Sequence, residues 1–252
     1  MYWDSARLPA LVARIQAYNQ SRLVGWDVRF LRRADLNTYI APAEYPPAFD
    51  KLIVQHKADW IRLALLSKYG GCWLDASIIL NHADALDRLY EESVAAKSEF
   101  TGFRCPNKCR SMSAMPPLCV DNWFLMAPRR SPFLRLAFEE FDRAVRTGFE
   151  LYRTQILKEG IDVQCVHQWK TSDYLTMQMC MLAVLQRLPS VPPMIFHSSV
   201  ESMYKLHTEC KWDAKCMEQI FHEEPERVRR IPYIKLTRGE RKKRMDLTAF
   251  LT

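Results

Sequence analysis

Glycine is scarce in this sequence, and glycine-rich phosphate-binding loops are missing. Only seven of the 252 residues are glycine. Neither G-x-G-x-x-G nor G-x-x-x-x-G-K-[ST] occurs, so the common dinucleotide-binding and P-loop sites are excluded. A nucleotide site in this chain would need another device, such as a carboxylate at the end of a strand together with a metal ion.

The sequence also lacks long apolar runs and a secretory start. No stretch approaches the roughly 20 apolar residues that a membrane-spanning helix needs. No basic start followed by an apolar core opens the chain. We therefore expect a cytoplasmic protein, with the membrane surface as an alternative location.

Cysteines are present without the spacing typical of zinc sites. None of the eight cysteines belongs to a C-x₂-C pair. Without a secretory signal, buried free thiols are the default expectation. Two alternatives stay open: a zinc site or disulfide among Cys105, Cys109 and Cys119, and a Cys210–Cys216 disulfide in an oxidising compartment.

Positive charge is in excess and gathers near the end of the chain. The formal net charge is +7, and the sequence pI is about 9.0. No nucleic-acid-binding motif accompanies this charge, so nucleic acid is not an expected partner. A solvated basic C-terminal tail is the ordinary interpretation, and peripheral contact with an anionic membrane or a charged glycan is the functional alternative. The basic residues concerned are Arg227, Arg229, Arg230, Lys235, Arg238, Arg241, Lys242, Lys243 and Arg244.

The order of expected elements predicts one α/β domain with a mostly parallel sheet. Apolar periodicity and start signals predict helices over 9–20, before Gly70, from Pro132 onward and over 172–188. Strands are expected over 26–31, 72–74, 78–80, 100–103 and 123–127. Such a length suits a single domain.

The segment Asp59–Ser77, DWIRLALLSKYGGCWLDAS, is the most informative part of the chain. Asp59 and Arg62 are three apart on an apolar helix, so they are neighbours on one face and must be paired or line a cavity. Gly70 can end this helix with a positive φ. The strand that follows delivers Asp75 at its carboxyl end, where open α/β sheets bind ligands. An internal ion pair and a turn-capping aspartate are the alternative interpretation.

The same segment resembles the sugar-binding region of glycosyltransferases with a DXD motif, D-x-x-R-x-x-x-L-x-x-x-G-G-x-x-x-D-x-D. The capsular polysaccharide synthesis branch is the closer match. One departure is that Ser77 stands at the third DXD position, so Asp75 is the only carboxylate that the motif offers to a metal. Further blocks that resemble the family are Tyr2-Trp3-Asp4, Asp121–Leu125, Trp169 with Asp173-Tyr174, and Tyr233–Thr237.

The resemblance implies a GT-A-like nucleotide-diphospho-sugar transferase fold, with a mostly parallel central sheet flanked by helices. Its first strand, ending at Tyr2-Trp3, is expected to be cut short. Residues 1–127 would form the donor-binding half, and residues 128–252 the acceptor-side half with the basic tail. The implied activity moves a hexose or pentose from a nucleotide-diphosphate sugar to a glycan or polysaccharide acceptor. The alternative is a non-catalytic member that binds sugar or nucleotide without turnover.

The resemblance also suggests roles for individual residues. Asp75, and Ser77 through water, would hold Mn²⁺ or Mg²⁺, and His197 or His207 is an alternative further ligand. Asp173 is the expected general base, alongside Asp75 as the second catalytic residue; a structural role at a helix start is the alternative for Asp173. The predicted donor-binding residues are Asp59, Arg62, Gly71, Asp75, Ser77, Asn122, Lys235, Tyr2 and Trp3. Lys235 would contact the donor diphosphate, and one of Tyr2 and Trp3 is expected in the core.

Overall fold

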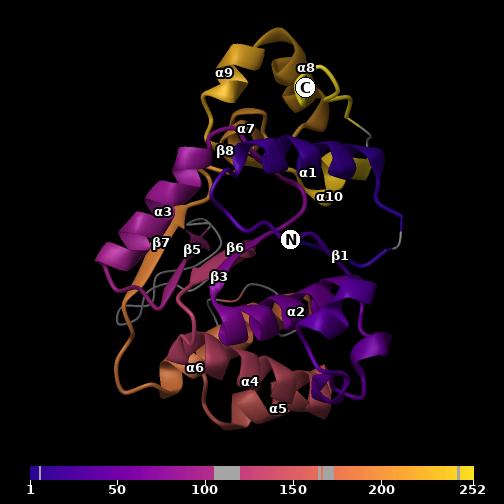
Figure 1. Cartoon of the computed structure of the whole chain (residues 1–252). Helices are drawn as coiled ribbons and strands as arrows, with labels where there is room; N and C mark the ends of the chain where they lie inside the picture. The colour runs from indigo at the N-terminus through magenta and orange to yellow at the C-terminus, as the bar shows by residue number, and fades with distance from the viewer. Residues whose placement is uncertain (6, 105–119, 164–165, 167–172, 243–244) are drawn as a thin grey trace. The chain divides into compact units, whose positions relative to one another are not determined.

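A computed structural model describes residues 1–5, 7–104, 120–163, 166, 173–242 and 245–252. Cys105, Cys109, Cys119, Cys165 and Trp169 lie outside the described residues. The chain forms two compact units, each built from separate stretches of sequence (Figure 1). Unit 1 contains Met1–Arg33, Leu74–Glu92 and His197–Thr252, and unit 2 contains Ala34–Trp73 and Ser93–Phe196. The functional division at residue 127 stays a prediction.

Unit 2 combines a four-stranded sheet with helices. The strands are ordered β3-β6-β5-β7, and α4 packs against α2, α5 and α6. The elements are α2 (Val54–Tyr69), β3 (Gly71–Leu74), β5 (Phe100–Arg104), β6 (Val120–Ala127), α4 (Pro132–Thr147), α5 (Phe149–Lys158), α6 (Thr176–Arg187) and β7 (Met194–Ser198). The α/β class is confirmed. The mostly parallel sheet is not confirmed, because β5 and β6 run antiparallel with Thr101 opposite Met126.

Two predicted helix boundaries in unit 2 are confirmed. Gly70 ends α2 with a φ of 67°, and its N–H donates to the carbonyl of Leu66 at 2.9 Å. A Cβ at Gly70 would also collide with the backbone of Pro128 and Arg129, so only glycine fits there. Ser131 accepts a hydrogen bond from the Leu134 N–H at the start of α4.

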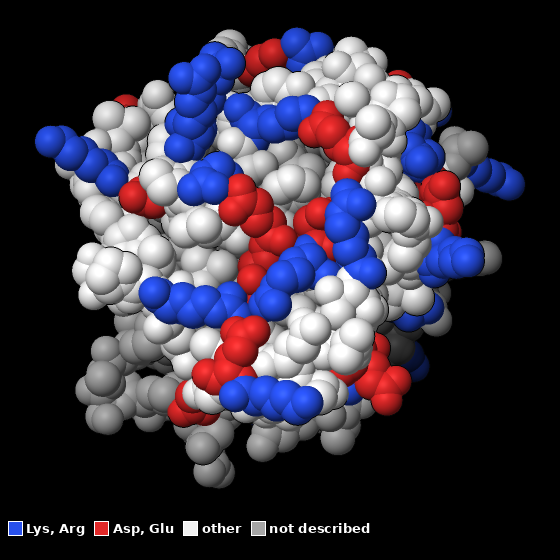
Figure 2. All heavy atoms as spheres, turned by 90° about the horizontal axis from the view of Figure 1, so that it is seen from below, with Lys and Arg blue, Asp and Glu red and all other residues white. Residues whose placement is uncertain are grey.

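Charges on unit 2 are interleaved instead of gathered by sign. Figure 2 looks onto this unit from below and shows basic and acidic side chains alternating over the surface. Unit 2 contains several ion pairs along or between helices. The pairs include Arg135–Glu139, Arg143–Glu140, Arg146–Asp142 and Arg187–Glu140. Basic and acidic side chains are therefore neighbours on the face in Figure 2, and the exclusion of nucleic acid as a partner stays a prediction.

Unit 1 is built on two short two-stranded sheets. β1 pairs with β2 in parallel, and β4 pairs with β8 antiparallel, with Ile78 opposite Lys235. The elements are β1 (Tyr2–Trp3), α1 (Ala10–Arg22), β2 (Leu31–Arg32), β4 (Ile78–Leu80), α3 (Ala83–Ala95, continuing into unit 2), α7 (Lys205–Glu209), α8 (Ala214–Glu223), α9 (Pro225–Arg229), β8 (Tyr233–Lys235) and α10 (Arg238–Lys242). No helix among the described residues is long and apolar enough to cross a membrane.

Two predictions for unit 1 are wrong. The strand expected over 26–31 is reduced to Leu31–Arg32, because Trp26 lies in a turn and its indole N–H donates to Asp87 at 2.7 Å. The described basic C-terminal residues do not form a solvated tail. The segment is folded, with Phe250 and Leu251 buried in the core, although Arg227, Arg230 and Arg238 are exposed as expected.

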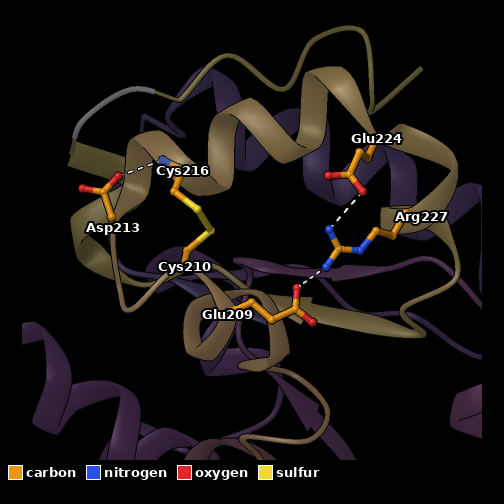
Figure 3. The surroundings of a disulfide bond; sticks show 6 residues. All are labelled: Glu209, Cys210, Asp213, Cys216, Glu224 and Arg227. Atoms are coloured by element: carbon orange, nitrogen blue, oxygen red, sulfur yellow. Dashed lines mark hydrogen bonds and ion pairs between the residues drawn. A yellow bond between two sulfur atoms is a disulfide. The ribbon is translucent and has the colours of Figure 1, made fainter.

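A disulfide joins Cys210, at the end of α7, to Cys216 in the first turn of α8 (Figure 3). This is the bridge that the sequence left open as an alternative. Cys72 and Cys180 are free, and burial raises the pKa of both thiols well above the ordinary value.

Removing this disulfide should cost unit 1 a modest amount of stability. The bond closes a loop with a sequence separation of six residues. Loop-closure entropy for such a short loop corresponds to about 2 kcal/mol. We expect Cys210→Ser/Cys216→Ser to lower the free energy of unfolding by about that amount, measured by chemical denaturation. Dithiothreitol should bring the wild type to the same value and leave the double variant unchanged; a wild type insensitive to it would contradict the prediction.

Candidate active site

Three predicted site residues meet in unit 1 and form what we call the lysine cluster: Asp75, Ser77 and Lys235. The Lys235 Nζ donates to Asp75 Oδ2 at 2.8 Å and to Ser77 Oγ at 2.7 Å. Lys235 and Ser77 are only 6% and 1% exposed. The Asp75 side chain is 27% exposed. The Lys235 ammonium is therefore held by two buried or partly buried oxygens, and the Asp75 carboxylate is partly exposed to solvent.

Strand pairing brings these distant residues together. The antiparallel register of β4 and β8 sets Ile78 opposite Lys235, so the residues just before β4 lie beside the end of β8. The pairing continues one step further, since the Leu236 N–H donates to the Ser77 carbonyl at 2.9 Å. The Ser77 hydroxyl donates in turn to the Leu236 carbonyl at 3.0 Å.

The lysine cluster fits a divalent cation poorly. The buried Ser77 hydroxyl already donates to Leu236 and accepts from Lys235, so only one acceptor lone pair remains for a metal-bound water. Asp75 contributes one carboxylate, and the ammonium of Lys235 already lies against it. Across the described ranges, no group of three or more His, Cys, Asp or Glu side chains could hold a metal ion. The set suits an ammonium better than Mn²⁺ or Mg²⁺.

A buried acid braces the chain that carries Lys235. Glu240 Oε2 accepts the Thr237 N–H at 2.6 Å and also the Thr237 hydroxyl. His207 Nε2 lies 3.5 Å from the same oxygen, and its ring is packed between Tyr204 and Trp212. The alternative of His207 as a metal ligand is therefore not supported, because its fully buried ring faces Glu240. The sequence signal that marks this brace is T-x-x-E, the spacing of a capping box.

His197 likewise has a partner of its own, since its Nε2 lies 3.0 Å from Glu92. The alternative of a histidine completing a metal site thus finds no support at either position. Both histidines lie beside a glutamate in unit 1.

Glu240 predicts a stability change in acid. Burial raises its pKa, but hydrogen bonds from His207 and Thr237 outweigh burial and lower the pKa from 4.5 to about 2. The ionised form is thus favoured in the fold, so its stabilising effect is complete above about pH 4.5 and is lost as the pH falls towards 2. We expect Glu240→Gln to flatten the pH dependence of the melting temperature in this window. Exposed Glu226→Gln is the control; equal profiles for wild type and Glu240→Gln would refute the assignment.

A second group, the arginine cluster, lies in unit 2 and consists of Asp59, Arg62 and Asn122. Asp59 forms a buried ion pair with Arg62, and the two are 1% and 3% exposed. The Asn122 Nδ2 donates to Asp59 Oδ1 at 3.0 Å. The guanidinium of Arg62 lies 5.1 Å from the Trp73 ring and 4.0 Å from the Met177 sulfur. The sequence alternative of an internal ion pair is confirmed, and the donor-binding role of the three residues stays a prediction.

The other predicted site residues are placed as follows. Asp173 begins the short 3-10 turn before α6, as expected, and pairs with Arg153. Gly71 is exposed with a φ of 90°. Tyr2 is buried in the core, as expected for one of the two N-terminal aromatics, and its hydroxyl donates to Asp4. Trp3 is partly exposed, with the Arg241 guanidinium 5.9 Å from its ring. The catalytic and binding roles remain predictions.

Comparisons with known proteins point in one direction. Residues 2–141 match the family described as capsular polysaccharide synthesis protein. The chain is also similar to the O-glycosyltransferase braB of Annulohypoxylon truncatum, with 28% identity over 159 residues. That match covers 56% of this chain and 36% of the relative, so it spans about a third of the relative's length. No solved structure matches the chain. The family match covers more than half of the chain, whereas the curated relative is matched only in part.

Proposed function

Since the chain belongs to the capsular polysaccharide synthesis protein family, we propose that it transfers a sugar from a nucleotide-diphosphate donor to a glycan or polysaccharide acceptor. A GT-A-like fold is part of this proposal. The observation that supports it best is the lysine cluster, in which a nearly buried ammonium is fixed beside the motif carboxylate.

The chemistry needs positive charge at one place. In glycosyl transfer, the bond from the anomeric carbon to the diphosphate oxygen breaks, and its electron pair stays on that oxygen. The acceptor oxygen bonds to the anomeric carbon and loses its proton to a general base. A preorganised cation at the leaving oxygen stabilises the transition state more than the bound donor.

Lys235 can supply that charge. Ser77 and Asp75 hold its Nζ in a fixed position, so little reorganisation is needed when negative charge develops on the diphosphate. Asp75 contacts the ammonium and is itself partly open to solvent. We therefore propose Lys235, and not a divalent ion, as the main source of positive charge at the leaving group.

The test is release of nucleoside diphosphate from a panel of nucleotide-diphosphate sugars by the purified chain. We expect release from one donor, persistence of most of it in EDTA, and loss in Asp75→Asn. Asp84→Asn, an exposed aspartate of α3 paired with Arg88, is the matched control and should keep full activity. Complete loss in EDTA with recovery in Mn²⁺ would assign the charge to a metal instead.

A non-catalytic member of the same fold is the second candidate. The observation that favours it is that Ser77 stands at the third motif position in place of a carboxylate, and that its hydroxyl donates a hydrogen bond to the Leu236 carbonyl. That protein would show a thermal shift with a nucleotide-diphosphate sugar and no release of nucleoside diphosphate from any donor.

A further inference from the structure

We propose that a pocket beside β8 in unit 1 binds an anionic group of the acceptor, a carboxylate or a phosphate. The identity of the ligand as an acceptor rests on the proposed function; the affinity for an anion does not. The pocket has a volume of about 320 Å³. Its lining residues are Glu201, Ser202, Lys205, Glu209, Arg227, Arg230, Ile231, Pro232 and Tyr233.

Two cations in the pocket are available to a ligand. Neither Lys205 nor Arg230 has an ion-pair partner among the residues that the structure describes, and both are exposed. Of the two acidic residues that line the pocket, Glu209 pairs with Arg227, and Glu201 has no ion-pair partner among the described residues. The pocket is therefore lined by two unpaired cations and one unpaired carboxylate, so its unpaired side chains carry a net charge of +1 that an anion would neutralise. An ammonium and a guanidinium suit oxygen anions such as carboxylate and phosphate.

The pocket wall is held in a fixed shape. Arg227 in α9 donates to Glu209 in α7 and to Glu224 just before α9, and the three side chains lie in line in Figure 3. The disulfide from Cys210 continues directly from Glu209 and ties this segment to α8. A site whose frame is fixed before binding loses less entropy when the ligand arrives.

The position of the pocket connects it to the lysine cluster. Side chains alternate along a strand, so Tyr233 and Lys235 lie on one face of β8 while Ile234 points into the core. Two residues along a strand correspond to about 7 Å. That spacing is close to the length of one sugar ring, and the half-buried Tyr233 offers an aromatic face to it. An acceptor anchored in the pocket would thus bring a neighbouring hydroxyl towards Lys235.

The experiment is a calorimetric titration of the full chain, without donor, using glucuronate, glucose 6-phosphate and glucose at low ionic strength. We expect at least one of the two anionic sugars to bind at least tenfold more tightly than glucose, and the tighter of the two identifies the acceptor group. Lys205→Gln/Arg230→Gln should remove that preference. Arg14→Gln/Lys215→Gln, which changes two exposed cations of unit 1 outside the pocket, should keep it.

Two results would overturn the proposal that the pocket binds an anion. One is equal affinity for all three sugars, and the other is an unchanged preference for the anionic sugar in Lys205→Gln/Arg230→Gln. Donor release measured on the same wild-type preparation separates this proposal from the proposed function. Release of nucleoside diphosphate without anion binding would reject the anion pocket and leave the transferase proposal intact. Anion binding that depends on Lys205 and Arg230, without release from any donor, would support the anion pocket and reject the transferase proposal.

Discussion

Replacing Lys235 by glutamine is expected to lower the rate of nucleoside diphosphate release by roughly 10²–10³-fold, the loss typical when one preorganised donor to a developing oxyanion is removed. Glutamine keeps a hydrogen-bond donor near Asp75 and Ser77 but removes the positive charge. The effect should fall mainly on kcat, because the charge on the leaving oxygen exists in the transition state and much less in the bound donor.

The measurement is steady-state release with the donor that the wild type accepts, at saturating concentration. Lys215→Gln, an exposed lysine of α8, is the matched control for loss of one positive charge. The melting temperature of each variant shows whether unit 1 is still folded. A folded Lys235→Gln variant within a few-fold of wild-type kcat would mean that another group neutralises the diphosphate.

The local parts of the site could be predicted from the sequence. Asp59 and Arg62 are three residues apart on one apolar helix, and that spacing predicts that they are either paired or line a cavity. Gly70 and Ser131 carry conformational and capping signals that act within a few residues. Such features depend on short-range geometry, so the sequence contains what is needed to find them.

Contacts between residues far apart in the sequence could not be predicted from such short-range signals. Asp75, Ser77 and Lys235 were each predicted as donor-binding residues, but their mutual contact depends on the pairing of β4 with β8. No periodicity in the sequence gives the partner of a three-residue strand. For the same reason the charge-rich C-terminal segment looked like a solvated tail, although Met245 and Leu247 bury it against the core.

Motif position does not give the contacts of a side chain. Ser77 occupies a place where related motifs have a carboxylate, which suggested a water-mediated metal contact. Its hydroxyl is instead spent on the Leu236 carbonyl, which fixes the approach of β8 to the motif. The T-x-x-E spacing of Thr237 and Glu240 was a usable signal for the brace behind Lys235, but only the contact with His207 shows that it is buried.

Arg62→Met is expected to destabilise the protein by about 3–5 kcal/mol, because it leaves the Asp59 carboxylate buried without its cation. The observation behind this figure is that both partners are almost fully buried, with Asn122 as a further donor to Asp59. Chemical denaturation measures the loss. The double variant Asp59→Asn/Arg62→Met should recover much of it, since a neutral pair of similar size removes the unpaired charge.

The matched control for Arg62→Met is Arg135→Met, whose i,i+4 pair with Glu139 is exposed, so the loss there should stay below about 1 kcal/mol. The comparison also separates two roles of Arg62. If its main task is to neutralise Asp59, the double variant is stable and still binds the donor. If its main task is to bind the donor, the double variant is equally stable, but both the single and the double variant bind the donor more weakly than the wild type. A stable Arg62→Met single variant would contradict the buried ion pair as a source of stability, because the energy of such a pair appears chiefly when one partner is lost.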